Sequence, residues 1–161
     1  LTSESFNIFS ETFYSGEFVV TYKSFAFQTE FSVVENKLGP DEILTMTKPR
    51  YQGGYVELSF FPTGGQRIID GTDGRFNSVD IANPVGAGGI GEIRLAARYD
   101  VADLTHETFG RKQNSIIFAA DWYLNDLIKI QANYAHSTIK NAMNIKTDIV
   151  NTLNTRFLFS F

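Results

Sequence analysis

The sequence predicts an all-β fold of antiparallel strands, and three observations support this prediction. Apolar and polar residues alternate with a period of two along most of the chain, whereas the 3.6-residue period of helices is almost absent. Tight connections alternate with long polar ones. Aromatic residues are frequent, with 15 Phe and 7 Tyr among 161 residues, and this content argues against disorder. The length fits a single domain over residues 1–161.

The composition excludes several classes of function. The chain has no Cys, which rules out a disulfide scaffold and a thiolate zinc or redox site. Its net charge of −4, without a basic run, does not suit nucleic-acid binding, because phosphate neutralisation supplies most of that affinity. No stretch approaches the roughly 18–20 apolar residues of a membrane-spanning helix. A β-barrel is then the one kind of membrane protein that fits.

The N-terminal part of the chain alternates less regularly than the rest. Residues 1–12 fit either a strand or a loop. The alternation then predicts strands over residues 14–22 and 25–35, joined by a tight Lys23-Ser24 connection, and a third strand over residues 52–61. In each of these segments, aromatic and aliphatic residues lie on one face and polar residues on the other.

The connection between residues 61 and 91 departs from the alternation of loop lengths. Counting from the tight turns places it at the short-turn end of the sheet, yet it is long and rich in Gly. A structureless run of this length is uncommon and usually has a function. A flexible linker is the alternative.

The C-terminal part gives the clearest strands. In residues 91–101, Glu92, Arg94 and Arg98 fall on one face while the aliphatic residues fall on the other, as only a strand would arrange them. Residues 114–124 and 127–137 form a hairpin around Asn125-Asp126, a pair that favours left-handed turn conformations. A last strand covers residues 152–161. Longer polar connections are expected at residues 37–50, 102–113 and 138–151.

Two folds are compatible with such two-faced strands. In a soluble β-sandwich the apolar face forms the core, whereas in a transmembrane barrel it meets lipid and the charged face lines the lumen. The terminal Phe and the aromatics near strand ends favour the barrel, because such rings form the interfacial girdles: Tyr22, Tyr99, Trp122, Tyr134 and Phe161. The predicted fold is therefore an antiparallel transmembrane β-barrel.

Four segments resemble the phosphate-selective porins O and P of Gram-negative bacteria. They read GGYVELSFFPTGGQR (residues 53–67), GEIRLAARYDVADL (residues 91–104), ADWYLNDLIKIQANYAHS (residues 120–137) and the terminal RFLFSF (residues 156–161). The resemblance implies a trimeric barrel of roughly sixteen strands in the bacterial outer membrane, of which this chain would supply the last seven or eight. If self-contained, the chain would instead form an eight-stranded barrel.

The charged strand faces supply the candidate pore-lining residues. They are Arg94, Arg98, Lys129, Arg156, Glu57, Glu92 and Asp121. Acids and bases in such positions often pair across strands. The resemblance further implies that the connection at residues 64–90 folds back into the lumen and narrows it, which makes Arg67 and Arg75 candidate constriction residues.

The expected function is passive diffusion of small solutes through an outer-membrane pore, including anions such as phosphate or polyphosphate. Outer-membrane lipid is an expected partner, and no cofactor, metal or catalytic step is expected. His106 and His136 lie near loop ends without a metal-ligand spacing. Two other classes stay open: a soluble β-sandwich that binds a ligand, and a small outer-membrane barrel with enzymatic loops.

Overall fold

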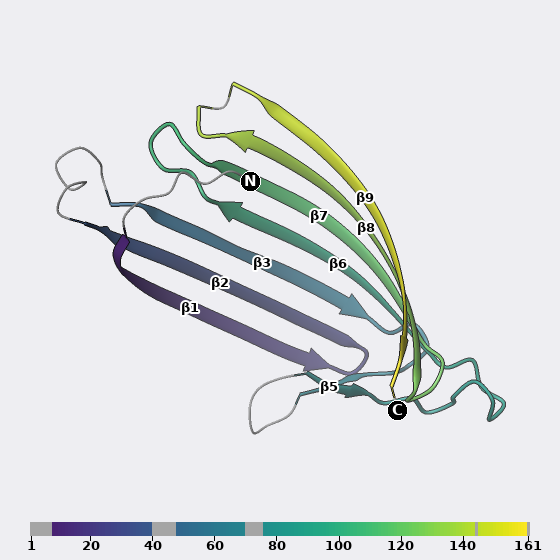
Figure 1. The fold of residues 1–161 in the computed structure, drawn as a ribbon. Coiled ribbons are helices and arrows are strands. Elements are labelled where there is room, and N and C mark those ends of the chain that lie inside the picture. Colours follow the sequence, from purple (N-terminus) through teal and green to yellow (C-terminus); the bar gives the residue numbers. More distant parts are fainter. Residues whose placement is uncertain (1–7, 40–47, 70–75, 144, 161) are drawn as a thin grey trace.

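The structure is a computed structural model that describes residues 8–39, 48–69, 76–143 and 145–160. Its strands form one curved antiparallel sheet of seven, in the order β1-β2-β3-β6-β7-β8-β9, and a separate two-stranded sheet, β4-β5 (Figure 1). The large sheet consists of β1 (Ile8–Tyr22), β2 (Phe25–Leu38), β3 (Arg50–Phe60), β6 (Glu92–Asp103), β7 (Arg111–Tyr123), β8 (Ile128–Asn141) and β9 (Thr147–Phe159). The small sheet pairs β4 (Arg67–Ile69) with β5 (Phe76–Val79).

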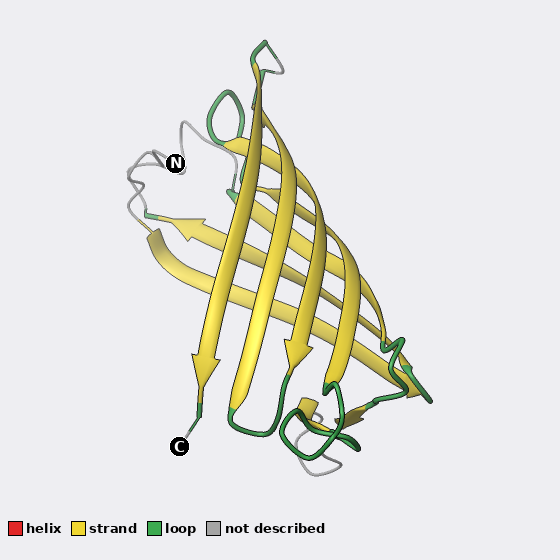
Figure 2. Cartoon of the chain, turned by 90° about the vertical axis from the view of Figure 1, so that its right-hand side faces the viewer, coloured by secondary structure: helices red, strands yellow, loops and turns green. Residues whose placement is uncertain are grey.

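The prediction of an all-β antiparallel fold is confirmed. Every strand of the large sheet pairs with its neighbours in an antiparallel register, and neighbouring strands run side by side while their direction changes gradually across the curved sheet (Figure 2). The described strands form an open sheet, with β1 and β9 at its edges. No helix among the described residues is long and apolar enough to cross a membrane.

One face of the large sheet is apolar and exposed. The register aligns a continuous apolar row across all seven strands, namely Val20, Phe27, Leu58, Ala97, Phe118, Tyr134 and Leu153. In this row, Phe118 is 57% exposed and Leu153 is 74% exposed. Exposed apolar patches of this extent mark a binding or membrane surface, so this outward face fits the lipid-facing side of a barrel.

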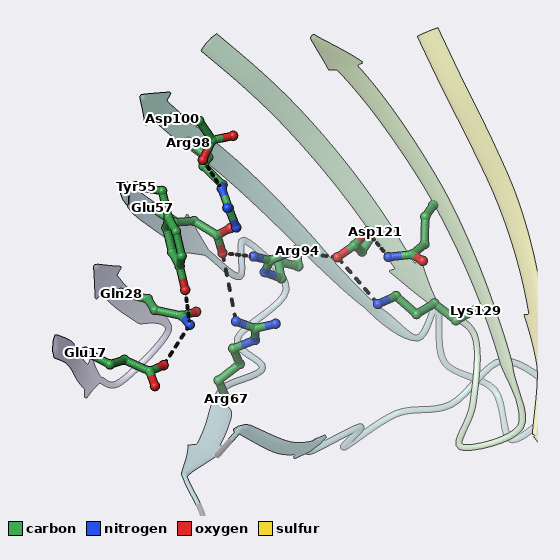
Figure 3. Close-up of polar contacts among 11 residues, drawn as sticks. Glu17, Gln28, Tyr55, Glu57, Arg67, Arg94, Arg98, Asp100, Asp121 and Lys129 are labelled. Atoms are coloured by element: carbon green, nitrogen blue, oxygen red, sulfur yellow. Dashed lines mark hydrogen bonds and ion pairs between the residues drawn. The ribbon is translucent and has the colours of Figure 1, made fainter. Parts of the chain in front are cut away.

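The opposite face is polar and partly buried. Its buried side chains include Arg94 and Asp121, whereas few large apolar side chains are buried among the described residues. A soluble sandwich would instead bury its apolar face against a second sheet. The described part of the chain contains no sheet that covers the apolar face, and the small β4-β5 sheet lies toward the polar side (Figures 1 and 3).

The predicted strands are correct in position, and the observed strands are longer. Residues 8–12, which the sequence left open, belong to β1, where they pair with the end of β2 after a register shift between Ile8 and Ser10. Strands β7 and β8 extend to Arg111 and Asn141 at the end of the sheet opposite the tight turns. The polar residues there hid the strand ends, because period-2 contrast is lost where both faces are hydrated.

The two tight turns have different backbones. Lys23 adopts a left-handed conformation, with φ of 52°, in the short β1–β2 connection. The prediction of left-handed conformations at Asn125-Asp126 is wrong, because neither residue has a positive φ. Instead, Asn125 Oδ1 accepts hydrogen bonds from the backbone N–H groups of Leu127 (3.0 Å) and Ile128 (2.9 Å). This side chain organises a wider turn in the manner of an Asx motif.

The long connection after β3 includes β4 and β5 and lies at the end of the sheet that carries the tight turns (Figure 1). Val85 N donates to Leu124 O at 2.7 Å, and Gly91 N donates to Asn83 O at 2.9 Å. The first bond fastens the returning part of the connection to the β7–β8 turn, and the second closes a turn within the connection. Gly91 has φ of +74°, and a Cβ there would lie 2.2 Å from Tyr123 O.

We expect Gly91→Ala to lower the free energy of unfolding by about 2–4 kcal/mol, because left-handed strain and a steric clash add together. The matched control is Gly86→Ala. Gly86 also has a positive φ, of 98°, but a Cβ there would meet nothing within 4 Å. That control should cost only about 1 kcal/mol. Urea titration of the lipid-reconstituted protein measures both. Equal losses would show that the close approach at Gly91 does not matter.

Candidate pore-lining site

The charged residues of the polar face converge from both halves of the sheet (Figure 3). The antiparallel register sets Glu57 of β3 opposite Arg98 of β6, and Arg94 of β6 opposite Asp121 of β7. Successive residues of a strand point to opposite faces, so these four side chains lie on the same face. The curvature of the sheet then turns the side chains of β3 toward those of β7 and β8.

Arg94 lies at the centre of this cluster. Its Nη1 donates to Asp121 Oδ2 at 2.7 Å, and its Nη2 donates to Glu57 Oε1. Asp121 also accepts from Gln131 Nε2 at 2.9 Å and lies 3.6 Å from Lys129 Nζ. Charge-assisted bonds of this kind are stronger than neutral ones. They cross-link β3, β6, β7 and β8 through side chains as well as through backbone pairing.

Arg67 joins the same cluster from outside the large sheet. It lies on β4, within the long connection, and its Nη1 is 3.9 Å from Glu57 Oε1. Burial lowers the pKa of Arg67, and the nearby positive charge of Arg94 lowers it further. A guanidinium stays charged in proteins even so. Glu57 is therefore a carboxylate shared by two arginines, one on the wall and one on the connection.

Arg98 is held on the β3 side of the polar face. Its Nε donates to Asp100 Oδ1 at 2.6 Å, and its guanidinium lies 3.6 Å from the centre of the Tyr55 ring. Tyr55 Oη in turn accepts from Gln28 Nε2 at 2.6 Å, which also donates to Glu17 at 3.2 Å. This chain of polar contacts continues the charged surface from β6 to β1.

Glu92 has a different environment from the other candidates. It is buried, and its carboxylate accepts hydrogen bonds from Thr63 Oγ1 and from Gly65 N, the latter at 3.0 Å. Thr63 Oγ1 also accepts from Ile93 N at 2.9 Å. Glu92 thus closes the long connection at its base by tying the chain just after β3 to the start of β6.

Lys129 and Arg156 differ in their pairing. Lys129 contacts Asp121 and lies 4.4 Å from the Tyr123 ring. Arg156 pairs with Gln131 in the β8–β9 register and forms no ion pair with any residue that the structure describes. Arg75, the second candidate on the connection, lies outside the described residues.

A hollow of about 310 Å³ lies over the cluster, lined by Glu57, Arg94, Arg98, Asp100, Asp121 and Gln131 among others. The described residues bring together no group of three acidic or His side chains that could hold a metal ion. His106 is buried in the β6–β7 connection, and His136 lies on the outward face.

The predicted charged residues share one face of the sheet, whereas the sequence did not identify their neutral partners. Gln28, Tyr55 and Gln131 share the period-2 positions of the charged residues. Their position on the same face as the charged residues was the signal that could have identified them as hydrogen-bond partners. Thr63 could not be found in this way, because its role depends on how the chain turns after β3.

We expect Arg94→Gln to lower the free energy of unfolding by about 1–3 kcal/mol, because it leaves Glu57 and Asp121 without their shared donor. Arg156→Gln is the matched control, since both arginines lie in one cross-strand row. The control should leave unfolding unchanged. Denaturant titration in lipid compares the two, and equal stabilities would contradict a structural role for Arg94.

Comparison with known proteins agrees with this geometry. Part of the chain is 37% identical over 94 residues to an uncharacterized protein of Caulobacter vibrioides, and the match covers 58% of this chain and 19% of that relative. This relative is therefore much longer than the matched region. The family model for phosphate-selective porin O and P matches residues 4–161, and the chain belongs to this porin family.

Proposed function

We propose that this chain forms part of the wall of a passive outer-membrane pore. The observation that carries the proposal is the division of one sheet into an exposed apolar face and a charged face that meets the long connection. A barrel wall between lipid and a water-filled lumen requires this division. Membership of the porin family supports a channel rather than an enzyme, and an outer-membrane location.

The charge balance of the central cluster supports a preference for anions. Arg67, Arg94 and Lys129 contribute three positive charges, against Glu57 and Asp121. Close pairing cancels most of this charge, so the remaining field is weak. Arg156 adds a cation without an ionic partner among the described residues. The family description suggests phosphate as the solute, and polyphosphate as a further solute and assembly as a trimer are additional parts of this proposal.

The connection at residues 64–90 is proposed to narrow the pore. Support comes from the contact between Arg67 and Glu57, which holds β4 against the charged side of the wall. On the opposite side, Val79 and Ile81 line a cavity of about 340 Å³ with Tyr123, Lys129 and Leu158. A segment that contacts the wall at Glu57 and faces Lys129 and Leu158 across this cavity would occupy part of the space that a solute crosses.

Arg156→Glu should shift the reversal potential toward cation permeation, because this cation is not neutralised by a neighbour. Glu57→Gln should shift the reversal potential toward anion permeation, since it removes one negative charge beside Arg67 and Arg94. Reversal potentials in planar bilayers under a salt gradient measure both effects. Lys23→Glu, on the exposed β1–β2 turn, is the control and should cause no shift. Unchanged selectivity in both variants would argue against a lumenal position for these residues.

Deletion of residues 66–79 should raise the single-channel conductance, because it removes the β4-β5 sheet while keeping Thr63, Gly65 and Glu92 at the base. Measurement in planar bilayers, with heat-modifiable gel mobility as the check on folding, tests the expectation. A folded deletion variant with the conductance of the parent would show that the segment does not restrict the pore.

A further inference from the structure

The upper limit of the outward apolar surface is not level across the sheet. On β1 the outward apolar residues reach Tyr14, toward the end of the sheet opposite the tight turns. The cross-strand row of Tyr14 continues to Lys112, Lys140 and Thr147 on β7, β8 and β9. On these last strands the outward face is therefore already polar at that level, as expected where tilted strands leave the hydrocarbon region.

A polar cluster lies on the outward face two rows below that one, beyond the row of Asn114, Thr138 and Ile149. Asn151 Oδ1 accepts hydrogen bonds from Tyr134 Oη at 3.0 Å and from His136 Nδ1 at 2.8 Å. All three side chains are exposed. With Oδ1 occupied, Asn151 keeps its amide donors available, directly above the exposed apolar surface of Leu153.

Two lysines face outward two rows above this cluster, four residues from His136 along β8. Lys112 and Lys140 are direct cross-strand partners on β7 and β8. Like charges in this arrangement destabilise a sheet. Lys112 is compensated by Asp103, whose Oδ2 lies 3.2 Å from its Nζ. Lys140 is exposed and forms no ion pair with any described residue.

We propose that Lys140, Lys112, His136 and Asn151 form a binding site for a phosphorylated lipid of the outer leaflet. The lysines bind the headgroup phosphate, and the Asn151 amide donates to polar groups where the headgroup joins the acyl chains. The chains then lie on the apolar face around Phe118 and Leu153. The site rests on the membrane placement in the proposed function, and it adds a specific lipid partner.

Charge complementarity favours a lipid over a second copy of the chain. Alternation places two carboxylates on the outward face of the described strands, Glu35 and Asp103. Glu35 lies 3.5 Å from Arg50, and Asp103 is paired with Lys112. The outward face of another copy thus offers no unpaired acid to Lys140 from these strands, whereas a lipid phosphate supplies the missing charge.

Native mass spectrometry in a neutral detergent tests the site, with diphosphorylated lipid A as the probe and phosphatidylcholine as the neutral comparison. Lipid A should bind in preference to phosphatidylcholine. Lys140→Gln should weaken lipid A binding about fivefold, as expected for one basic residue near a membrane surface. The single variant Asn151→Leu should weaken lipid A binding more than Lys140→Gln does. The matched control is Lys37→Gln, an outward lysine at the same end of β2, which should keep the affinity of the parent.

Several results would overturn the proposal. One is equal weakening by Lys37→Gln and Lys140→Gln, which would indicate general attraction to charge. Another is displacement of lipid A by equimolar inorganic phosphate, which would identify a free-anion site. A disulfide between two copies of a Thr138→Cys variant in lipid would identify a protein interface. The conductance of Lys140→Gln should equal that of the parent protein. Lipid binding therefore tests the proposed lipid site, whereas conductance separately tests the proposed pore.

Discussion

The rest of this structure depends on the continuous antiparallel register from β1 to β9. Side chains alternate between faces along each strand, so a slip of one residue would move every apolar side chain of that strand to the polar side. The register therefore sets which residues meet lipid and which meet water. It also brings Glu57, Arg94 and Asp121 together, although they are far apart in sequence.

Inside this frame, a few ion pairs serve two purposes. Arg94 links three strands and at the same time sets how much charge the polar surface presents. Such a pair stabilises only modestly where water has access, but several pairs that share Glu57 and Asp121 constrain one another. The stability of the sheet and the electrostatic field of its polar face are thus coupled through the same side chains, and the charge of this face cannot be changed there without a structural cost.

The sequence was sufficient to predict the strands, their faces and the face of the charged residues, because alternation is a local property that can be read from a single sequence. It was insufficient for features set by distant contacts. The turn at Asn125 depends on a side-chain acceptor, and β4-β5 pairs two short segments too weakly patterned to recognise. Glu92 has the alternation of a pore-lining residue, yet its carboxylate is used by Thr63 and Gly65.

The closure at Thr63 and Glu92 has a consequence for how such a protein can change over evolution. The two residues fasten both ends of the long connection to one point of the wall. Loop-closure entropy grows only slowly with length, by about 0.6 kcal/mol for each doubling. Insertions and deletions between these ends should therefore be tolerated while the wall stays the same. The connection is in this sense an exchangeable module, whose length can diversify while the sheet that carries it stays the same.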